Sequence, residues 1–486
     1  MGFAAIDYVI LVVYLGGIAF LGYLQRGKQA TASDYFLGKD VIPWWVVCFS
    51  VVAAETSSLT FISIPGLAYA TNMGFLQVTL GYLLGRILVS IFLLPAYYGG
   101  ELSTAYAYLE RRFGLQTRRF ASVVFLLTRT AADGVRLFAT AIPLKLILNI
   151  DYPFAIAIIA AVALAYTTFG GVRGVVWVDA LQMLVYLGGA LLTVFVLIYQ
   201  SEGGLAALIQ PAMEAGKFQI FDWGWTGDFF KKPYTVLGGL FGGAFLSMAS
   251  HGTDQLIVQR VLTTKSLPNS RKALIGSGIV VILQFALFLF VGLLLYGHYA
   301  GAQLSQLGLV RADEIFPDFI IHGLPPGVSG FIIAGLFAAA LSSLSGSMSS
   351  LASSTMLDLY KPYAGLRLTP EKEFAMARRI TVGWGILLVG SATFFMTSGQ
   401  TVVELALSIA SFTYGGLLGT FLLGVLVRKA DQSVALISFV ASIVTMLIVV
   451  TSGLVAWTWF TVVGTAVTLI VGFSLSRFRT VSAGKE

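Results

Sequence analysis

The sequence predicts an all-α polytopic membrane protein with about 13 transmembrane helices. Hydrophobic residues make up 57% of the 486 residues and charged residues only 11%, whereas soluble domains carry about 25% charged residues. Apolar stretches long enough to cross a bilayer recur along the chain. Two of these stretches become polar near their middle, where a continuous apolar helix would be expected. The single cysteine, Cys48, excludes a disulfide framework and a cysteine-based metal site.

The apolar stretches define the expected spans in chain order. The first begins without a basic region before it, and Arg26 and Lys28 follow it, so it is a retained span rather than a cleaved signal peptide. The expected bounds are 5–25, 42–70, 74–98, 120–149, 153–170, 176–200, 234–258, 273–298, 327–360, 374–397, 402–427, 431–452 and 455–476.

The basic residues predict the orientation of these spans. With the N-terminus outside and the C-terminus cytoplasmic, most of the 30 Lys and Arg lie in or beside cytoplasmic loops, as the positive-inside rule requires. The net charge of +7 is therefore explained by topology, and we expect no nucleic-acid partner. We expect a monomer in a plasma membrane, as in a bacterial inner membrane. The basic residues left on the outer side are Lys145, Lys217, Lys231, Lys232 and Arg311.

Two interrupted spans suggest how the chain is organised. The second span is polar between Ser50 and Gly66, and the seventh between Gly242 and Gln255. Irregular backbone at membrane depth is tolerated only inside protein or beside a cavity, and breaks at matching places in two halves indicate inverted repeats around a midplane site. The expected parts are 1–41 (first peripheral span and cytoplasmic loop), 42–200 (first five-span repeat), 201–233 (extracellular loop), 234–427 (second five-span repeat) and 428–486 (two peripheral spans and cytoplasmic tail).

The ninth span is unusual because Gly335–Ser354 carries eight serines. Hydroxyls in a bilayer need partners, so such a cluster faces protein, water or an ion. Ser342, Ser343 and Ser345 crowd one helical arc with the oxygens that a small hard cation needs. Close helix packing through small residues is the alternative explanation.

Several motifs resemble those of the sodium/solute symporter family, which includes bacterial sodium-coupled sugar, sialic acid and proline transporters. The motifs are Gly170–Gln182, Asp254–Ser266, Asp358–Tyr360 and Tyr108–Phe113, in matching order together with the serine run. The resemblance extends from about residue 35 to residue 423. It implies a LeuT-like core of 5+5 inverted repeats with broken second and seventh spans, and sodium as the coupling ion.

The resemblance also implies a principal sodium site between the second and ninth spans. The ligands carried over by position are the carbonyls of Ala53, Thr56 and Ala339 and the hydroxyls of Ser342 and Ser343. The spacing agrees, because residues at i, i+3 and i+4 share one helix face and a broken helix frees carbonyl oxygens.

Asp179 is a candidate for a second sodium site or for the ion's exit route. An intramembrane carboxylate is a functional candidate by default, and some members of the family build a second site from this aspartate and serines of the ninth span. Ser345 matches that pattern, but Gly346 stands where such members carry another serine. The alternative is a structural carboxylate paired with Arg173.

The substrate is expected beside the principal sodium ion. Thr60, Ser247 and Ser250 replace side chains of the hexose pocket, so that pocket is not reproduced. Members that transport sialic acid resemble this chain in Ser57, Thr60 and Phe75. All candidate substrate-binding residues are Ser57, Thr60, Ser63, Phe75, Gln77, Thr79, Arg129, Arg136, Ser247, Ser250 and His251.

The fourth span carries the charges best suited to an anionic substrate. Arg129, Asp133 and Arg136 share one helix face, and a guanidinium can bind a carboxylate bidentately. The family resemblance points to Arg129 as the carboxylate ligand. A closed structural network of both arginines with Asp133 and Glu55 is the alternative.

The leading hypothesis is a sodium-driven symporter that imports a small polar solute by alternating access, with an anionic sugar acid such as sialic acid favoured. A neutral monosaccharide, an amino acid or a monocarboxylate is the alternative, and a transporter-like membrane sensor is a remote one. An enzyme is not expected, because the three histidines are scattered along the sequence.

Overall fold

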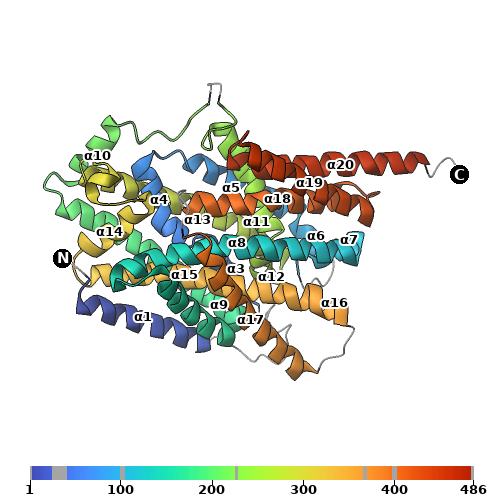
Figure 1. Cartoon of the computed structure of the whole chain (residues 1–486), viewed down its shortest axis with the longest axis horizontal. Coiled ribbons are helices and arrows are strands. Elements are labelled where there is room, and N and C mark those ends of the chain that lie inside the picture. The colour runs from blue at the N-terminus through green and yellow to red at the C-terminus, as the bar shows by residue number, and fades with distance from the viewer. Residues whose placement is uncertain are drawn as a thin grey trace.

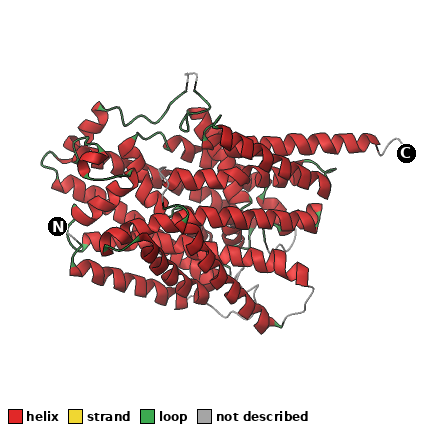
Figure 2. Cartoon of the chain, viewed as in Figure 1, coloured by secondary structure: helices red, strands yellow, loops and turns green. Residues whose placement is uncertain are grey.

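The computed structural model describes residues 3–24, 41–98, 104–224, 228–364, 369–396 and 402–482. The side chains of Ser342 and of most residues in 165–172 lie outside this description. Every regular element among the described residues is helical (Figure 2). Most long helices run along the long axis of the molecule, with α10 and α14 at one end and α7 and α16 at the other (Figure 1).

The helices follow one another along the chain as a bundle of long and short segments. Their bounds are α1 Ala5–Leu24, α3 Trp44–Glu55, α4 Ser58–Ala70, α5 Leu76–Phe92, α6 Leu94–Tyr98, α7 Ala107–Phe113, α8 Leu115–Leu148, α9 Tyr152–Gln200, α10 Gly204–Glu214, η1 Gly238–Gly242, α11 Gly243–Gly252, α12 Gln255–Leu262, α13 Leu267–His298, η2 Leu304–Leu307, η3 Ala312–Glu314, α14 Ile315–His322, α15 Val328–Ser354, η4 Thr355–Tyr360, α16 Lys361–Ala364, α17 Pro370–Thr393, α18 Val402–Leu426, α19 Gln432–Ser452, η5 Trp457–Trp459 and α20 Phe460–Ser482.

The prediction of an all-helical membrane protein is confirmed. Within the described residues, seven helices are long and apolar enough to cross a membrane, and the bent pair of α3 and α4 adds an eighth. One difference from the expected spans concerns α9, which is a single helix of 49 residues where two spans were expected. The sequence between those two expected spans contains glycines but no proline, and glycine weakens a helix without ending it.

The expected break in the second span is present. Helix α3 ends at Glu55 and α4 begins at Ser58, and the two axes are bent by 62°. Ser57 is extended, and its Oγ accepts a hydrogen bond from Leu59 N at 3.2 Å. This is the bond with which a serine N-cap starts a new helix. The polar residues in the middle of this span therefore cap a helix inside the bundle.

The expected break in the seventh span is also present, between α11 and α12. Asp254 is extended, and its Oδ1 accepts a hydrogen bond from Leu256 N at 2.8 Å, so it caps α12 as Ser57 caps α4. Helix α11 packs closely on α5, because a Cβ at Gly85 would collide with the Ala244 carbonyl. Helix α11, which leads into the second break, is therefore packed directly on α5.

The segments between the long helices form a cover over the end of α4. Lys217, just after α10, donates from Nζ to the carbonyls of Tyr69 and Thr71 at 2.7 and 2.9 Å. These bonds satisfy carbonyls at the end of the helix. Burial lowers the pKa of the Lys217 ammonium below its ordinary value. Asp313 accepts a hydrogen bond from Val402 N at 3.3 Å, which ties the cover to the start of α18.

Candidate functional site

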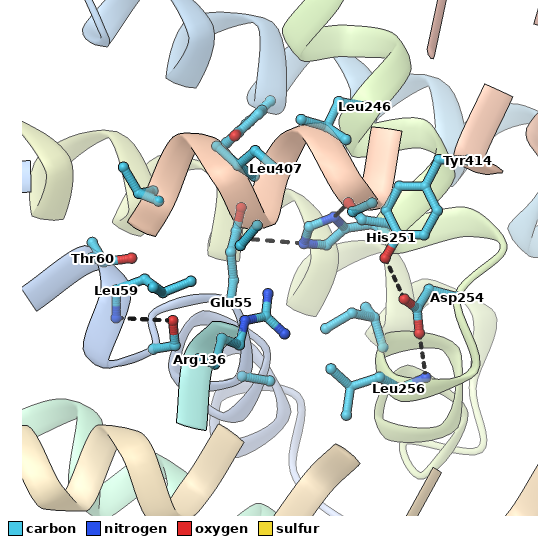
Figure 3. A pocket seen from close by; sticks show the side chains of 18 of the residues that line it. Glu55, Leu59, Thr60, Arg136, Leu246, His251, Asp254, Leu256, Leu407 and Tyr414 are labelled. Atoms are coloured by element: carbon cyan, nitrogen blue, oxygen red, sulfur yellow. Dashed lines mark hydrogen bonds and ion pairs between the residues drawn. The ribbon is translucent and has the colours of Figure 1, made fainter. Parts of the chain in front are cut away.

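A cavity lies between the two helix breaks, with α8 and α18 as further walls. Figure 3 shows side chains from these separate elements converging on it. Most of the predicted substrate residues line the cavity, so the structure brings together groups from four spans. Those that line it are Ser57, Thr60, Phe75, Arg129, Arg136, Ser250 and His251.

The other four predicted substrate residues are buried without lining the cavity. Gln77 donates from Nε2 to the carbonyls of Gly74 and Tyr234, both at 3.1 Å, so it ties α5 to the segment before η1. Thr79 donates to the Leu76 carbonyl in its own helix, at 2.8 Å. The remaining two are Ser63 and Ser247, and Oγ of each has no hydrogen-bond partner among the described residues.

Glu55 lies at the end of α3 and faces the cavity. Its Oε2 forms an ion pair with Arg86 Nη2 of α5 and lies 3.5 Å from His251 Nε2. Ser250 Oγ lies 2.8 Å from His251 Nδ1. The alternative weighed from the sequence placed Glu55 with the arginines of the fourth span, but its arginine partner is Arg86, which is fully buried. This cluster joins the first broken span to the second.

Arg129 donates hydrogen bonds to three buried side chains. Its Nε donates to Asp133 at 2.7 Å, its Nη1 to Asp254 at 3.3 Å and its Nη2 to Ser347 at 3.2 Å. Asp254 also accepts from the hydroxyl of Tyr414 at 2.5 Å. The structural network considered for the fourth span is therefore present, but Asp254 takes the place expected for Glu55.

Arg136 is bound differently from Arg129. It donates from Nη1 to Asp133 at 2.6 Å, and its buried Nε has no hydrogen-bond partner among the described residues. Arg136 lines the cavity together with Glu55 and Thr60, and Figure 3 shows its side chain extending into the site below Glu55. A guanidinium has five N–H donors, so Arg136 retains donors for a ligand.

The charges around the cavity balance one another. Three arginines (86, 129 and 136) face three carboxylates (55, 133 and 254) in the described part of the site. Each carboxylate has an arginine partner, as buried charges require. A monoanionic ligand therefore meets a balanced site in which Arg136 lines the cavity and has a buried Nε with no hydrogen-bond partner among the described residues.

The predicted sodium ligands lie where α3 breaks and where α15 passes it. Ser57 N bonds to the Glu55 carbonyl and Thr60 N bonds to the Ser57 carbonyl. The carbonyls of Ala53 and Thr56 therefore lose the amide partners, four residues on, that a continuous helix would supply. Buried carbonyl oxygens released from the helical pattern in this way are the kind of ligand that an alkali cation takes.

The serine run supplies buried hydroxyls to the same region. Ala339 and Ser343 of α15 are buried, and Ser343 Oγ has no hydrogen-bond partner among the described residues. The side chain of Ser342 lies outside the described residues, so its predicted role is not addressed by the structure. The described residues fit a sodium ion in the chemistry of their oxygens.

Asp179 of α9 lies in a separate buried cluster. Its Oδ2 accepts from Ser50 Oγ at 2.8 Å and from Arg260 at 3.2 Å (Nε) and 3.0 Å (Nη2). The arginine partner is thus Arg260 of α12 rather than Arg173, the alternative weighed from the sequence. A Cβ at Gly346 would collide with Arg260 Nη2, so the glycine makes room for the guanidinium. Ser345, the residue before Gly346, is also buried.

Some residues of the site were not predicted. Asp254, Tyr414 and Tyr82 line the cavity, and Arg260 pairs with Asp179. Asp254 and Arg260 stand in one recognised motif, and charged residues at membrane depth are functional candidates. That signal was available in the sequence, whereas the two tyrosines carry no local signal.

Comparison with known proteins agrees with this geometry. The sodium:solute symporter family matches residues 35–442. The chain is 31% identical to a sodium/sialic acid symporter, NanT, of Aliivibrio fischeri, over 97% of this chain and 93% of the relative. It is 30% identical to the sodium/sialic acid symporter SiaT of Proteus mirabilis, over 92% of this chain and 89% of the relative.

A solved structure gives the same result. It is a substrate-bound, outward-open sodium-coupled sialic acid symporter that superposes with a TM-score of 0.87 at 29% identity, covering 98% of each chain. These relatives are transporters rather than enzymes. The match of the family over most of the sequence, with a cavity between two helix breaks, shows that this chain belongs to the sodium:solute symporter family.

Proposed function

We propose that this chain imports an anionic sugar acid of the sialic acid type, driven by sodium. The observation that carries the proposal is Arg136, a cavity-lining guanidinium with an unbonded Nε in the described part of the chain, beside the broken helix in which two carbonyls lose their i+4 amide partners. A sugar acid offers one carboxylate to the arginine and hydroxyls to Ser57, Thr60 and Ser250. The relatives named above, which are sialic acid symporters, support this substrate class.

Arg136 is the proposed carboxylate ligand, in place of Arg129. Arg129 spends three of its five donors on three buried partners, whereas Arg136 spends one in the described part of the chain, so Arg136 has more donors to offer a substrate. Arg136 can bind a carboxylate while it keeps its bond to Asp133. In this proposal Arg129 positions Asp133, and Asp133 in turn orients Arg136.

The sodium ion binds beside the substrate in the proposed cycle. Its ligands are the carbonyls of Ala53, Thr56 and Ala339 with the hydroxyls of Ser342 and Ser343. Sodium joins α15 to the broken helix α3, and the ordered break then presents Ser57 and Thr60 to the substrate. One bundle rocks against the rest to expose the site to the other side of the membrane.

One sodium ion per cycle is proposed rather than two. The carboxylate of Asp179 already has a buried cation, the guanidinium of Arg260, and the space at Gly346 is filled by Nη2. A second cation beside one carboxylate would meet like-charge repulsion in a region of low dielectric. Asp179 then belongs to the ion's route toward the cytoplasm, together with Ser345.

The proposal extends to the arrangement of the whole chain. The proposed chain has thirteen spans, with a LeuT-like core of two five-span inverted repeats between the first span and the last two. This count requires the 49-residue α9 to supply both the fifth and the sixth span. The N-terminus is outside and the C-terminus cytoplasmic, and the protein is a monomer in the lipid bilayer of a plasma membrane. The two capped breaks, each at the start of a repeat, support the repeat assignment.

A binding screen tests the substrate class. Purified protein is titrated with sialic acid, its methyl ester, a neutral hexose, an amino acid and a monocarboxylate, each with sodium or with potassium, and thermal stability is followed. Sodium-dependent stabilisation by sialic acid, with a weaker effect of the ester, is expected. Equal stabilisation by the acid and its ester would contradict a role for a carboxylate-binding arginine.

A further inference from the structure

Gln182 of α9 is a fully buried amide with no hydrogen bond. Its exposure is 0%, and neither Nε2 nor Oε1 has a hydrogen-bond partner among the described residues. Buried polar side chains nearly always have partners, and an exception calls for an explanation such as an ion or a bound water. The proposed symport function has so far given this residue no role.

The neighbours of Gln182 on α9 show which face it occupies. Asp179 and Tyr186 stand three residues before and four residues after it, so all three share one helix face. Asp179 bonds to Ser50 of α3 at 2.8 Å. Tyr186 donates to Gln284 Oε1 at 3.1 Å, and the Gln284 amide is bonded to the Thr56 hydroxyl. This face therefore looks onto α3 along the stretch from Ser50 to Thr56.

The register between helices places Gln182 at the level of the proposed sodium site. Asp179 and Ser50 are hydrogen-bonded, and this pair sets the register between α9 and α3. Three residues further along each helix, Gln182 is therefore level with Ala53. On α15, Gly335 packs against Tyr186 and Ile332 packs against Gly189, so the two helices run antiparallel. The same register brings Ala339 level with Gln182.

Polar groups free to bind a ligand gather at this level from three helices. The hydroxyl of Ser343 and the amide of Gln182 have no hydrogen-bond partner among the described residues, and the carbonyl of Ala53 lacks the amide partner four residues on, because Ser57 N bonds to Glu55 instead. Three such groups in one buried region are explained together if they share a ligand. A neutral amide oxygen suits a small hard cation and still allows release, whereas a carboxylate at this position would hold the cation more strongly.

We propose that Gln182 Oε1 is a further ligand of the transported sodium ion, added by α9 to the oxygens from α3 and α15. This inference rests on the proposed sodium site. In this arrangement the sodium ion is bound by oxygens from three helices, α3, α9 and α15. Asp179, on the same face of α9 as Gln182, stays paired with Arg260.

The test compares the sodium dependence of substrate binding in purified full-length variants. Gln182→Leu removes the oxygen at nearly the same volume and should raise the half-saturating sodium concentration roughly 10-fold or more, as changes beside a bound metal do, while binding at high sodium persists. Thr193→Val is the matched control, because Thr193 is equally buried on α9 and its hydroxyl, within the described residues, bonds to the Gly189 carbonyl of its own helix. It should leave the sodium dependence unchanged.

Two further variants separate the outcomes. Ser343→Ala should also weaken sodium binding; if it does while Gln182→Leu does not, the role of Gln182 is overturned and the sodium site stands. If neither variant changes the sodium dependence, the site itself is wrong. Gln182→Glu decides the case in which the leucine variant fails to fold: sodium binding should become stronger as pH rises and the new carboxylate ionises, and a pH-independent sodium affinity would refute the proposal.

Discussion

Replacing Arg136 by glutamine is the most informative change in the substrate site. The variant keeps a polar side chain that can reach Asp133 but removes the charge and the planar pair of donors. Hydrogen bonds to charged groups contribute about 1.5–3 kcal/mol each. Because about 1.4 kcal/mol corresponds to a factor of 10 in affinity, loss of one such bond should weaken binding of a carboxylate substrate roughly 10- to 100-fold.

The assay is a titration of purified protein with sialic acid and with its methyl ester at saturating sodium. Arg136→Gln should weaken binding of the acid strongly and binding of the ester little, because the ester has no charge to lose. Arg129→Gln is the comparison. It leaves Asp254 without its arginine and Asp133 with one instead of two, and breaking buried pairs costs about 3–5 kcal/mol, so its main effect should be on thermal stability. Equal loss for acid and ester in the Arg136 variant would refute the reasoning.

Three further predictions concern the ion, the Arg260 cluster and the cover over α4. Joint replacement of Ser342 and Ser343 by alanine should abolish sodium-dependent uptake while membrane insertion persists; unchanged sodium dependence would contradict the site. Gly346→Ala should displace the Arg260 guanidinium and lower thermal stability. In flux measurements the wild type should carry one sodium ion per substrate; a ratio of two would contradict the proposal that Arg260 takes the place of a second sodium ion beside Asp179. Burial raises the pKa of Asp313 above its ordinary value. Above about pH 4 this carboxyl therefore ionises in the unfolded chain before it does in the folded protein, and the wild type should lose stability relative to Asp313→Asn as the pH rises. A stability difference that is constant with pH would contradict this.

The sequence predicted the elements that depend on local patterns. Breaks in the second and seventh spans were expected, because these apolar spans become polar in the middle; the structure places them at Ser57 and Asp254, which cap the following helices. The gathering of Arg136, Ser250 and Thr60 in one cavity was expected from the order of the family motifs. These features depend on residue type and on spacing within one segment.

The pairings between helices could not be predicted in the same way. The sequence offered Arg173 as a partner for Asp179 and Glu55 as a member of the fourth-span network, since both are near in sequence or in expected depth. The structure joins Asp179 to Arg260 and Glu55 to Arg86. Such pairs depend on the register of helices that are distant in the chain, and no local pattern encodes it.

Uptake into proteoliposomes tests the central claim most directly. Vesicles containing the purified protein are given radiolabelled sialic acid outside, with an inward gradient of sodium or of potassium, and internal accumulation is followed. The account predicts accumulation above the external concentration with the sodium gradient alone, and its collapse when a sodium ionophore removes the gradient. Equal accumulation with sodium and potassium, or none with either, would contradict sodium-driven import of this substrate.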